Sequence, residues 1–498
     1  MKFEYFNKPL TGTILTIIMA LVGFGLLVML SASLGLGAMS AEYEYNSLHF
    51  FVRQLMSMLM GLVLMFIIYK GPDISELRSK FTWPLIVVTI LLLIWTLLSA
   101  SVNGVHRWIS IGGFRFQPGE LAKLSTILLW AWYLVNNRKK IMEVSRAQLS
   151  VVKSKNGAQD KNSWWHIFSQ DWLKAQWKGA VESLKVLWPA MFISGFMLTL
   201  IEIGKDLGTV IVIVATMAIM IFVAGTALEL ITMAFLGGCL GVVALLLKES
   251  YRMSRIVSWL DPFADSQGAG YQAVNSFIAI GSGGFWGVGI PFSRQKFDFL
   301  PEMHCDFIYA IICEELGFVG AFGLLLLFVC LICCCLRVAS DCKDPYKSMV
   351  AFGIAVQVTG QALFNIGVVT GLLPNKGLPL PFVSAGGSSL MVTLVSMGIL
   401  LNISRYVETN PKQDIIAPKK RKIPREGATI SSSDQQVCVT PVNSSEWEAI
   451  VAGARVKSEA KLPRPAIKAS WSSVAEATNT NDDSEDNSEE NGEQKSPS

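Results

Sequence analysis

The sequence predicts an all-α, polytopic integral membrane protein that crosses a bilayer about ten times. Of its 498 residues, 52% are hydrophobic and 16% are charged, and the mean hydropathy is +0.45. Soluble globular domains usually carry about 25% charged residues, so the composition argues against a soluble protein. The apolar residues are concentrated between Leu10 and Tyr406, whereas the residues that follow are mostly polar. We therefore expect a membrane-embedded core at 1–405 and a separate tail at 406–498.

Ten stretches are candidates for transmembrane helices, because a helix needs roughly 20 mostly apolar residues to cross the hydrocarbon core. They are 13–35, 50–69, 82–100, 119–136, 187–203, 207–224, 227–247, 307–336, 348–370 and 385–403. The first stretch is too long for the apolar region of a cleavable signal peptide. Lys205 and Asp206 divide the apolar region 187–247. A charge inside the membrane costs about 2.5–3.5 kcal/mol on insertion scales, so we expect both residues at a membrane edge.

The Lys and Arg residues of the loops orient the chain, because cytoplasmic loops are enriched in both. If the N-terminus is cytoplasmic, the inner loops 137–186 and 337–347 are basic, and so is the start of the tail at Lys419–Lys422. Most of the outer loops hold few Lys or Arg, with the long loop 248–306 as the exception. This distribution predicts that both termini are cytoplasmic and that the number of spans is even.

Two segments look like additions to the membrane core. The loop 137–186 is basic and contains four tryptophans, Trp164, Trp165, Trp172 and Trp177. This composition is typical of an interfacial segment held against anionic lipid. The tail at 406–498 is rich in Ser, Asn, Lys and Glu and carries the acidic run Asp482–Asp486. Because such a composition cannot bury a core, we expect the tail to be a disordered cytoplasmic segment.

The outer loop 101–118 is the first candidate site. It contains Arg107, Trp108 and Arg115 together with two consecutive glycines. One interpretation is a tight glycine turn in which Trp108 anchors the loop at the membrane interface. The other is an anion-binding surface beside an aromatic ring, since guanidinium groups suit phosphate oxygens.

The helix that follows this loop begins with a pair of opposite charges. Glu120 and Lys123 are three residues apart, a spacing that lets them form an ion pair on one helix face. An ion pair inside a membrane span indicates a functional site by default, but a structural clamp fits equally well.

The longest outer loop, 248–306, carries basic residues near its start and a run of glycines further on. Arg252 and Arg255 are the basic residues. The run Gly281–Gly289 follows no predicted strand and lies on the wrong side of the membrane for a nucleotide, so it is not a nucleotide-binding motif. It predicts close backbone packing or a re-entrant segment.

An acidic cluster spans the end of this loop and the start of the next helix. Its members are Glu302, His304, Asp306, Glu314 and Glu315. A single acid at this place is usually a helix N-cap, and Asp306 alone fits that role. Four acids and a histidine are harder to explain by capping, so the cluster predicts a site at the outer face.

The last outer loop contains three prolines and several glycines between Gly371 and Ser389, so it cannot continue a helix. Lys376 is its one cation, and Ser388 lies near its end. Non-helical backbone at membrane depth is tolerated where it is buried in protein or lines a wet cavity. We therefore expect Lys376 to face a cavity.

Taken in order, these segments resemble the SEDS family of bacterial cell-wall polymerases, the FtsW/RodA proteins. The matching motifs are Gly104–Ile109, Gln117–Lys123, Lys205–Thr209, Leu300–Ile308, Glu314–Gly317 and Leu380–Ser389. Each motif is weak alone, but together they are specific, and the resemblance covers residues 10–405. It implies the SEDS fold and a peptidoglycan glycosyltransferase that joins lipid II units into β-1,4 glycan strands at the outer leaflet.

The resemblance also implies roles for single residues. Asp306 corresponds to the family's essential aspartate, Trp108 to its outer-loop tryptophan and Lys376 to the lysine of its last outer loop. A carboxylate suits the chemistry, because the attacking sugar hydroxyl must lose a proton, a step that general-base catalysis accelerates by about 10²–10⁴-fold. The pyrophosphate leaving group needs cations, which Arg107, Lys376 and Arg252 or Arg255 could supply.

The remaining candidates support this arrangement. Glu302 and His304 are further candidate substrate contacts. Structural or cavity roles are expected for Glu120, Lys123, Asp206, Glu314, Glu315 and Ser388. No cofactor is certain, although the chemistry leaves room for a divalent cation, Mg²⁺ or Mn²⁺.

Within the family, Asn375–Leu378 resembles the division protein FtsW more than the elongation protein RodA. A septal position in the bacterial cytoplasmic membrane is therefore expected. Two residues depart from the family pattern: Ala385 stands where the family has Tyr, and Cys305 where it has Thr. The resemblance implies lipid II, a class B penicillin-binding transpeptidase, other divisome proteins and membrane lipids as partners, and no nucleic acid.

Three other functions are compatible with part of the sequence. An elongation-type polymerase is the alternative within the family. A lipid II flippase or another transporter would also use buried charges and broken outer loops. The acidic cluster lies on one side of the membrane with no inverted repeat, which favours chemistry there. An inactive scaffold is disfavoured because the acidic motif and Lys376 are intact.

Overall fold

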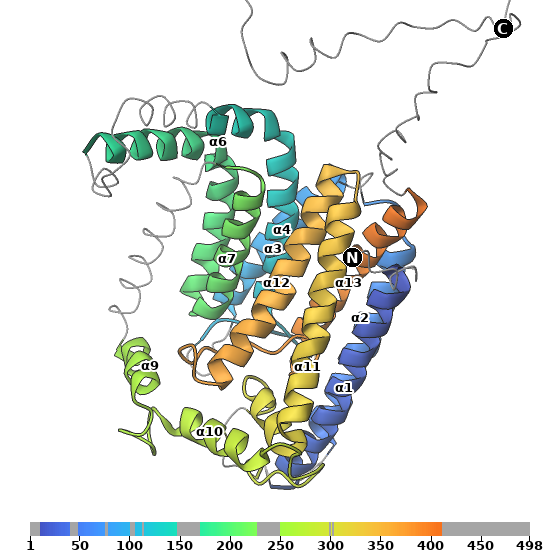
Figure 1. Ribbon diagram of the computed structural model, residues 1–498, viewed down its shortest axis with the longest axis vertical. Helices are drawn as coiled ribbons and strands as arrows, with labels where there is room; N and C mark the ends of the chain where they lie inside the picture. The colour runs from blue at the N-terminus through green and yellow to red at the C-terminus, as the bar shows by residue number, and fades with distance from the viewer. Residues whose placement is uncertain are drawn as a thin grey trace, which may run out of the picture. The chain divides into compact units, whose positions relative to one another are not determined.

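The computed structural model describes residues 10–39, 48–74, 78–99, 105–111, 114–146, 170–226, 250–297, 300 and 303–410 (Figure 1). Its elements, in chain order, are α1 (Leu10–Met39), α2 (His49–Lys70), α3 (Arg78–Leu98), β1 (Ile109–Ile111), β2 (Phe114–Phe116), α4 (Pro118–Asn136), α6 (Gln170–Ile203), α7 (Leu207–Val223), α9 (Ser250–Leu260), α10 (Tyr271–Gly283), α11 (Ile308–Asp341), α12 (Pro345–Val369) and α13 (Gly387–Thr409). The predicted tail after residue 410 and the predicted span at 227–247 lie outside the described residues.

The helices confirm a polytopic α-helical membrane protein. Nine of the ten predicted spans coincide with helices of the described part of the chain. Seven of these helices are long and apolar enough to cross a membrane: α1, α2, α3, α6, α11, α12 and α13. The helix α7 has 17 residues, and α4 carries the charges of Glu120 and Lys123. α4 packs inside the bundle, where a partly polar helix is tolerated, and α7 buries one face against α4 and α12 while its other face is exposed.

Burial separates an inner set of helices from an outer set. In α13 and α12, 83% and 67% of the apolar window is buried, compared with 28% in α2 and α3. The outer helices present large side chains such as Val63, Phe66 and Leu91 at the surface, as expected of helices that face lipid. Figure 1 shows α11 and α12 side by side, with α1 and α2 beside them. The inner helices therefore hold the outer loops in place.

The structure departs from the predicted elements at two places. The loop 101–118 contains a small antiparallel hairpin, in which Ser110 of β1 pairs with Arg115 of β2. The predicted cytoplasmic loop 137–186 is partly helical, because residues 138–146 are helical and α6 already begins at Gln170. Three of its four tryptophans have side chains outside the described residues, and Trp177 is exposed on α6.

The helix α11 is broken at Gly317, where the backbone has φ 64° and ψ −164°. The loop after α10 supplies the backbone partners that a helix break leaves unsatisfied. The amides of Val288 and Gly289 donate to the carbonyls of Glu314 and Glu315, both at 2.9 Å. On the other side of the break, the amides of Phe318 and Val319 donate to the carbonyls of Gly284 and Phe285, at 3.0 and 3.2 Å.

Glycine is required where these two backbones touch. A Cβ added at Gly287, whose φ is +81°, would lie 2.2 Å from the carbonyl oxygen of Glu315. A Cβ added at Gly317 would lie 2.3 Å from the nitrogen of Gly287. The close backbone packing predicted for the glycine run Gly281–Gly289 is therefore confirmed.

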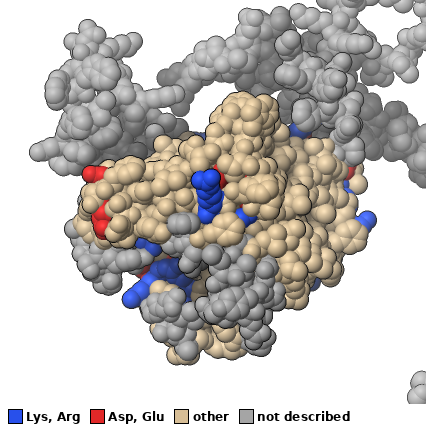
Figure 2. Space-filling view, turned by 90° about the horizontal axis from the view of Figure 1, so that it is seen from below, with Lys and Arg blue, Asp and Glu red and all other residues tan. Residues whose placement is uncertain are grey.

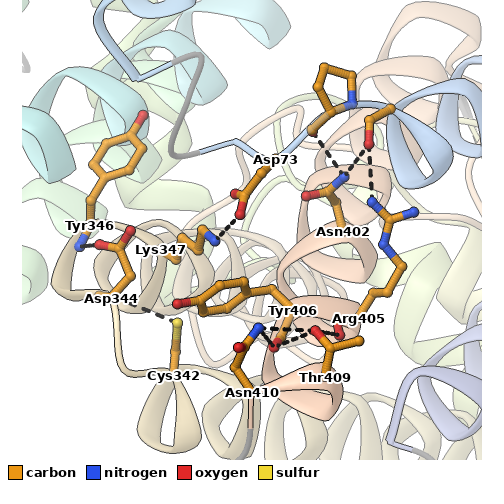
Figure 3. Close-up of polar contacts among 12 residues, drawn as sticks. Asp73, Cys342, Asp344, Tyr346, Lys347, Asn402, Arg405, Tyr406, Thr409 and Asn410 are labelled. Carbon is orange, nitrogen blue, oxygen red and sulfur yellow. Dashed lines mark hydrogen bonds and ion pairs between the residues drawn. The ribbon is translucent and has the colours of Figure 1, made fainter.

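The end of the bundle that the loop charges predict to be cytoplasmic is joined by polar contacts (Figure 3). Asn402 of α13 lies within 3.1–3.4 Å of four backbone carbonyls at the end of α2, those of Ile68, Tyr69, Gly71 and Pro72. Lys347 of α12 pairs with Asp73 at 2.6 Å and lies 3.1 Å from the ring centroid of Tyr406. The contacts join α2, α12 and α13 at this end.

Candidate functional site

Asp306 lies directly before α11 but does not cap it. The N-cap residue is Phe307, and no side chain makes a capping hydrogen bond there. The capping interpretation of Asp306 is therefore wrong. The Asp306 carboxylate instead lies against the last outer loop, because a Cβ added at Gly377 would be 2.7 Å from Asp306 Oδ2. The carboxylate thus contacts the residue that follows Lys376.

Asn365 of α12 connects the two backbone segments that meet here. Its Nδ2 donates to the carbonyl of Asp306 and to that of Leu378, both at 2.7 Å. The side chain is buried, and its Oδ1 accepts no hydrogen bond from the described residues. Asn365 therefore fixes the distance between the segment carrying Asp306 and the loop carrying Lys376.

The residues before Asp306 run beside the end of the same loop. The amide of Ala385 donates to the carbonyl of His304 at 2.8 Å, and Cys305 Sγ lies 3.4 Å from the carbonyl oxygen of Ala385. The His304 ring packs against Phe50 of α2, with centroids 4.6 Å apart. The two departures from the family pattern, Cys305 and Ala385, therefore contact each other.

The basic residues of this region approach the loop from α9. Arg255 Nη1 lies 3.3 Å from the carbonyl oxygen of Asn375, the residue before Lys376. Arg255 therefore contacts the segment that carries Lys376. Arg252 also belongs to α9, but its side chain lies outside the described part of the chain, as does the whole of Glu302.

Arg107 and Trp108 lie beside the corner between α6 and α7. Arg107 donates to the carbonyl of Lys205, and both Arg107 and Trp108 are half-buried. Lys205 is exposed and Asp206 is buried. Asp206 caps α7 by accepting from the amide of Thr209 at 3.3 Å, and its second oxygen accepts from Gln117 Nε2 at 2.8 Å.

The α6–α7 corner also touches the last outer loop. A Cβ added at Gly208 would lie 3.2 Å from the Leu378 side chain and 3.7 Å from the carbonyl oxygen of Gly377. The Ser388 hydroxyl accepts from the amide of Gln117 at 3.3 Å and joins α13 to the same corner. The last outer loop therefore links the corner that Arg107 contacts to the segment of Asp306.

The ion pair predicted between Glu120 and Lys123 is present, at 2.7 Å, and both side chains are buried. Lys123 also donates to Gln361 Oε1 at 2.7 Å, and Gln361 Nε2 donates to the carbonyl of Pro379 at 2.8 Å. The pair is thus connected to the last outer loop by hydrogen bonds through Gln361 of α12. This arrangement matches the structural clamp.

Glu314 and Glu315 hold the loop after the glycine run. Glu314 accepts from the hydroxyl of Ser293 and from the amides of Arg294 and Gln295. Glu315 pairs with the buried Lys296 at 3.2 Å and accepts from Ser31 of α1 at 2.6 Å. Both carboxylates thus bind residues of the loop 248–306 in this structure.

Sequence reasoning missed several polar residues that support the site, three inside helices and one in the loop after α10. They are Gln54, Gln361, Asn365 and Lys296. Gln54, for example, donates to the carbonyl of Ser384 at 3.0 Å. A carboxamide inside an apolar span is a signal that could have found three of them, because a polar group there needs a partner.

The outer end of the molecule is mostly uncharged at its surface. Figure 2, which views it from below, shows Lys and Arg side chains more prominently than Asp and Glu. Within the described residues, no three or more His, Cys, Asp or Glu side chains come together as metal ligands. Among the described residues, Asp306 is therefore not part of such a cluster.

Comparison with known proteins identifies the family. Residues 12–409 match the family model FTSW_RODA_SPOVE, described as a cell cycle protein. The chain belongs to the FtsW/RodA/SpoVE family. The resemblance drawn from the sequence motifs is thereby confirmed.

Two named relatives agree with this family. Stage V sporulation protein E of Bacillus subtilis (strain 168) is 37% identical over 396 residues, which cover 78% of this chain and 95% of the relative. A probable peptidoglycan glycosyltransferase FtsW of Geobacter sp. (strain M18) is 33% identical over 394 residues, 78% and 95% of the two chains.

The fold resembles a chain in the structure described as "Structural coordination of polymerization and crosslinking by a peptidoglycan synthase complex". The TM-score is 0.55 at 24% identity, covering 79% of this chain and 97% of that one. This likeness supports the FtsW/RodA/SpoVE fold for the described helices.

Proposed function

We propose that this FtsW/RodA/SpoVE protein is a peptidoglycan glycosyltransferase that polymerises lipid II at the outer face of the cytoplasmic membrane. Relatives named as peptidoglycan glycosyltransferases support the activity. The observation that carries the site is the contact of the Asp306 carboxylate with Gly377, next to Lys376.

Asp306 is the proposed general base. It would accept the proton of the attacking sugar hydroxyl, and the geometry around Asn365 would keep its backbone in register with the last outer loop. One carboxylate suffices, because the leaving group is a pyrophosphate that departs without a proton. A glycosidase, in contrast, uses two carboxylates on either side of the bond it cleaves.

Lys376, Arg255 and Arg107 are the proposed contacts for the pyrophosphate. Arg255 and Lys376 meet at the segment that contains Asn375, while Arg107 lies at the α6–α7 corner. Preorganised cations stabilise negative charge that develops on a leaving group without reorganising during the reaction. Trp108 and His304 are further proposed substrate contacts, as are Arg252 and Glu302, whose side chains lie outside the described part of the chain.

A divalent cation such as Mg²⁺ or Mn²⁺ is compatible with one carboxylate at the site. Mg²⁺ is often held by one or two carboxylates together with substrate phosphates. Asp306 is the residue that would hold it here, and the ion would supply additional positive charge to the pyrophosphate.

The biological setting is proposed on the same basis. The division-type sequence Asn375–Leu378 favours a role in septal cell-wall synthesis, with a class B penicillin-binding transpeptidase as the partner. We expect both termini in the cytoplasm. The loop 137–186 and the tail at 406–498 are then available to other division proteins and to membrane lipids.

The test is polymerisation of labelled lipid II by the full chain, reconstituted with a cognate transpeptidase. We expect Asp306→Asn to abolish glycan strands while Asp341→Asn, at an exposed surface pair with Arg337, polymerises like wild type. An Asp306→Asn variant that polymerises at the wild-type rate would overturn the general-base role. Wild-type protein that moves lipid II across vesicles without forming polymer would make it a transporter.

A further inference from the structure

A cavity of about 370 Å³ lies beside the candidate site, between α9, α10, Phe307 at the start of α11 and the beginning of the last outer loop. Its size is within the range of small-molecule sites. Phe307 directly follows Asp306, and Asn375, which also lines the cavity, directly precedes Lys376. The cavity is therefore next to both candidate residues along the chain, but neither of them forms its wall.

The polar side chains of the cavity are held in defined orientations. Trp259 Nε1 donates to the carbonyl of Gly371 at 2.8 Å, so the indole is fixed at the wall. Asn375 Nδ2 donates to Gln272 Oε1 at 2.7 Å. This bond leaves two groups for a ligand: the side-chain NH₂ of Gln272 as a donor and the side-chain oxygen Oδ1 of Asn375 as an acceptor.

The polarity and charge of the remaining lining residues indicate which class of ligand the cavity can bind. Phe277, Phe307 and Leu373 provide apolar surface, and the hydroxyls of Ser254 and Ser258 provide small polar groups. Among the described residues that line the cavity, Arg255 is the only basic one and none is acidic. A pyrophosphate would need more cations than this, and a polyprenyl chain would leave the carboxamides without partners.

We propose that this cavity is a saccharide subsite that holds an N-acetylated sugar ring of the lipid-linked substrate. An aromatic ring fixed at the wall can stack on the apolar face of a pyranose. The Gln272 and Asn375 carboxamides match the hydroxyl groups and the N-acetyl group, which both donate and accept hydrogen bonds. The subsite would present the sugar to Asp306 from the side of α9 and α10.

This inference rests on the proposed function, since a sugar is expected here only if the substrate is a lipid-linked saccharide. Binding can be measured without turnover, however, which separates the two ideas. The probe is the soluble disaccharide GlcNAc–MurNAc, added at millimolar concentration to the full chain in lipid nanodiscs and observed by saturation-transfer NMR.

The decisive variant is Ala273→Phe, which places a ring inside the cavity, with Ala264→Phe as the matched control. Ala264 lies exposed in the loop between α9 and α10 and does not line the cavity. We expect saturation transfer from wild type and from Ala264→Phe, and its loss in Ala273→Phe.

In the polymerisation assay, Gln272→Ala should raise the half-saturating lipid II concentration about tenfold, the loss expected for one good hydrogen bond. Ala273→Phe should raise it at least as much, because the ring fills the cavity. The maximal rate should change little. Equal saturation transfer from Ala273→Phe and wild type would overturn the sugar subsite. Absence of polymer from wild type that still binds disaccharide at the cavity would instead overturn the proposed function.

Discussion

The side-chain amide of Asn365 lies 2.7 Å from the carbonyl oxygen of Asp306, and it spans from there to the carbonyl of Leu378. The two carbonyls belong to segments separated by about seventy residues of sequence. One buried carboxamide thus ties the candidate base to the loop that carries Lys376.

Asn365 should therefore act as a positioning residue. Asn365→Ala removes both hydrogen bonds, and Asn365→Asp places a carboxylate against two carbonyl oxygens. We expect the maximal rate of lipid II polymerisation to fall at least tenfold in both, and further in Asn365→Asp because of the repulsion. Thr370→Val is the control, because the Thr370 hydroxyl bonds only within its own helix end. Unchanged rates in folded Asn365 variants would exclude the role.

Much of the fold could be predicted from local sequence. The arrangement of the site could not, because it depends on contacts between distant segments. A span is visible from roughly 20 apolar residues, and the pair of Glu120 and Lys123 from their spacing on one helix turn. The contact between Asp306 and Gly377 joins distant segments. No periodicity encodes it. The acidic cluster and the single cation Lys376 indicated the two segments, but nothing in the sequence showed that they touch.

The break at Gly317 inside α11 was not predicted from the sequence. A glycine in an apolar span is compatible with an ordinary helix, and its positive φ depends on the loop that packs against it. The same holds for Gln54, Gln361 and Asn365. Each is a polar residue in a span, and its partner is a carbonyl on another segment.

Replacing Gly317 by Ala should destabilise the protein, because the added methyl would lie 2.3 Å from the Gly287 nitrogen at a residue with positive φ. We expect a loss of about 2–4 kcal/mol, from strain and from displaced loop hydrogen bonds. Gly323→Ala in the same helix is the matched control, since a Cβ there meets no atom within 4 Å. Thermal unfolding in detergent should show Gly317→Ala well below wild type and Gly323→Ala at or slightly above it. Similar midpoints for the two variants would contradict the packing argument.

Glu314→Gln should loosen the outer loop without unfolding the helices. The Glu314 carboxylate accepts from Arg294 N at 2.9 Å and from Gln295 N at 3.4 Å, and a carboxamide would turn an NH₂ group toward one of these donors. Hydrogen bonds to charged groups contribute about 1.5–3 kcal/mol. Hydrogen exchange of the Arg294 and Gln295 amides should therefore accelerate at least tenfold, while amides in α12 exchange as in wild type. Unchanged exchange at 294–295 would show that the carboxylate does not hold the loop.

The ion pair between Asp73 and Lys347 predicts a coupling between helices at the end of the bundle that is expected to be cytoplasmic (Figure 3). Lys347 is 1% exposed, so Asp73→Ala would leave a buried ammonium group with the Tyr406 ring as its main partner. Because Asp73 is 31% exposed, water would offset part of this cost, and we expect a loss of about 2 kcal/mol rather than the 3–5 of a fully buried pair.

The double variant Asp73→Ala, Lys347→Met should be more stable than Asp73→Ala alone, because it also removes the buried charge. Thermal unfolding of wild type, both single variants and the double variant measures this coupling. Additive losses in that cycle would mean that the pair does not stabilise the junction of α2 with α12.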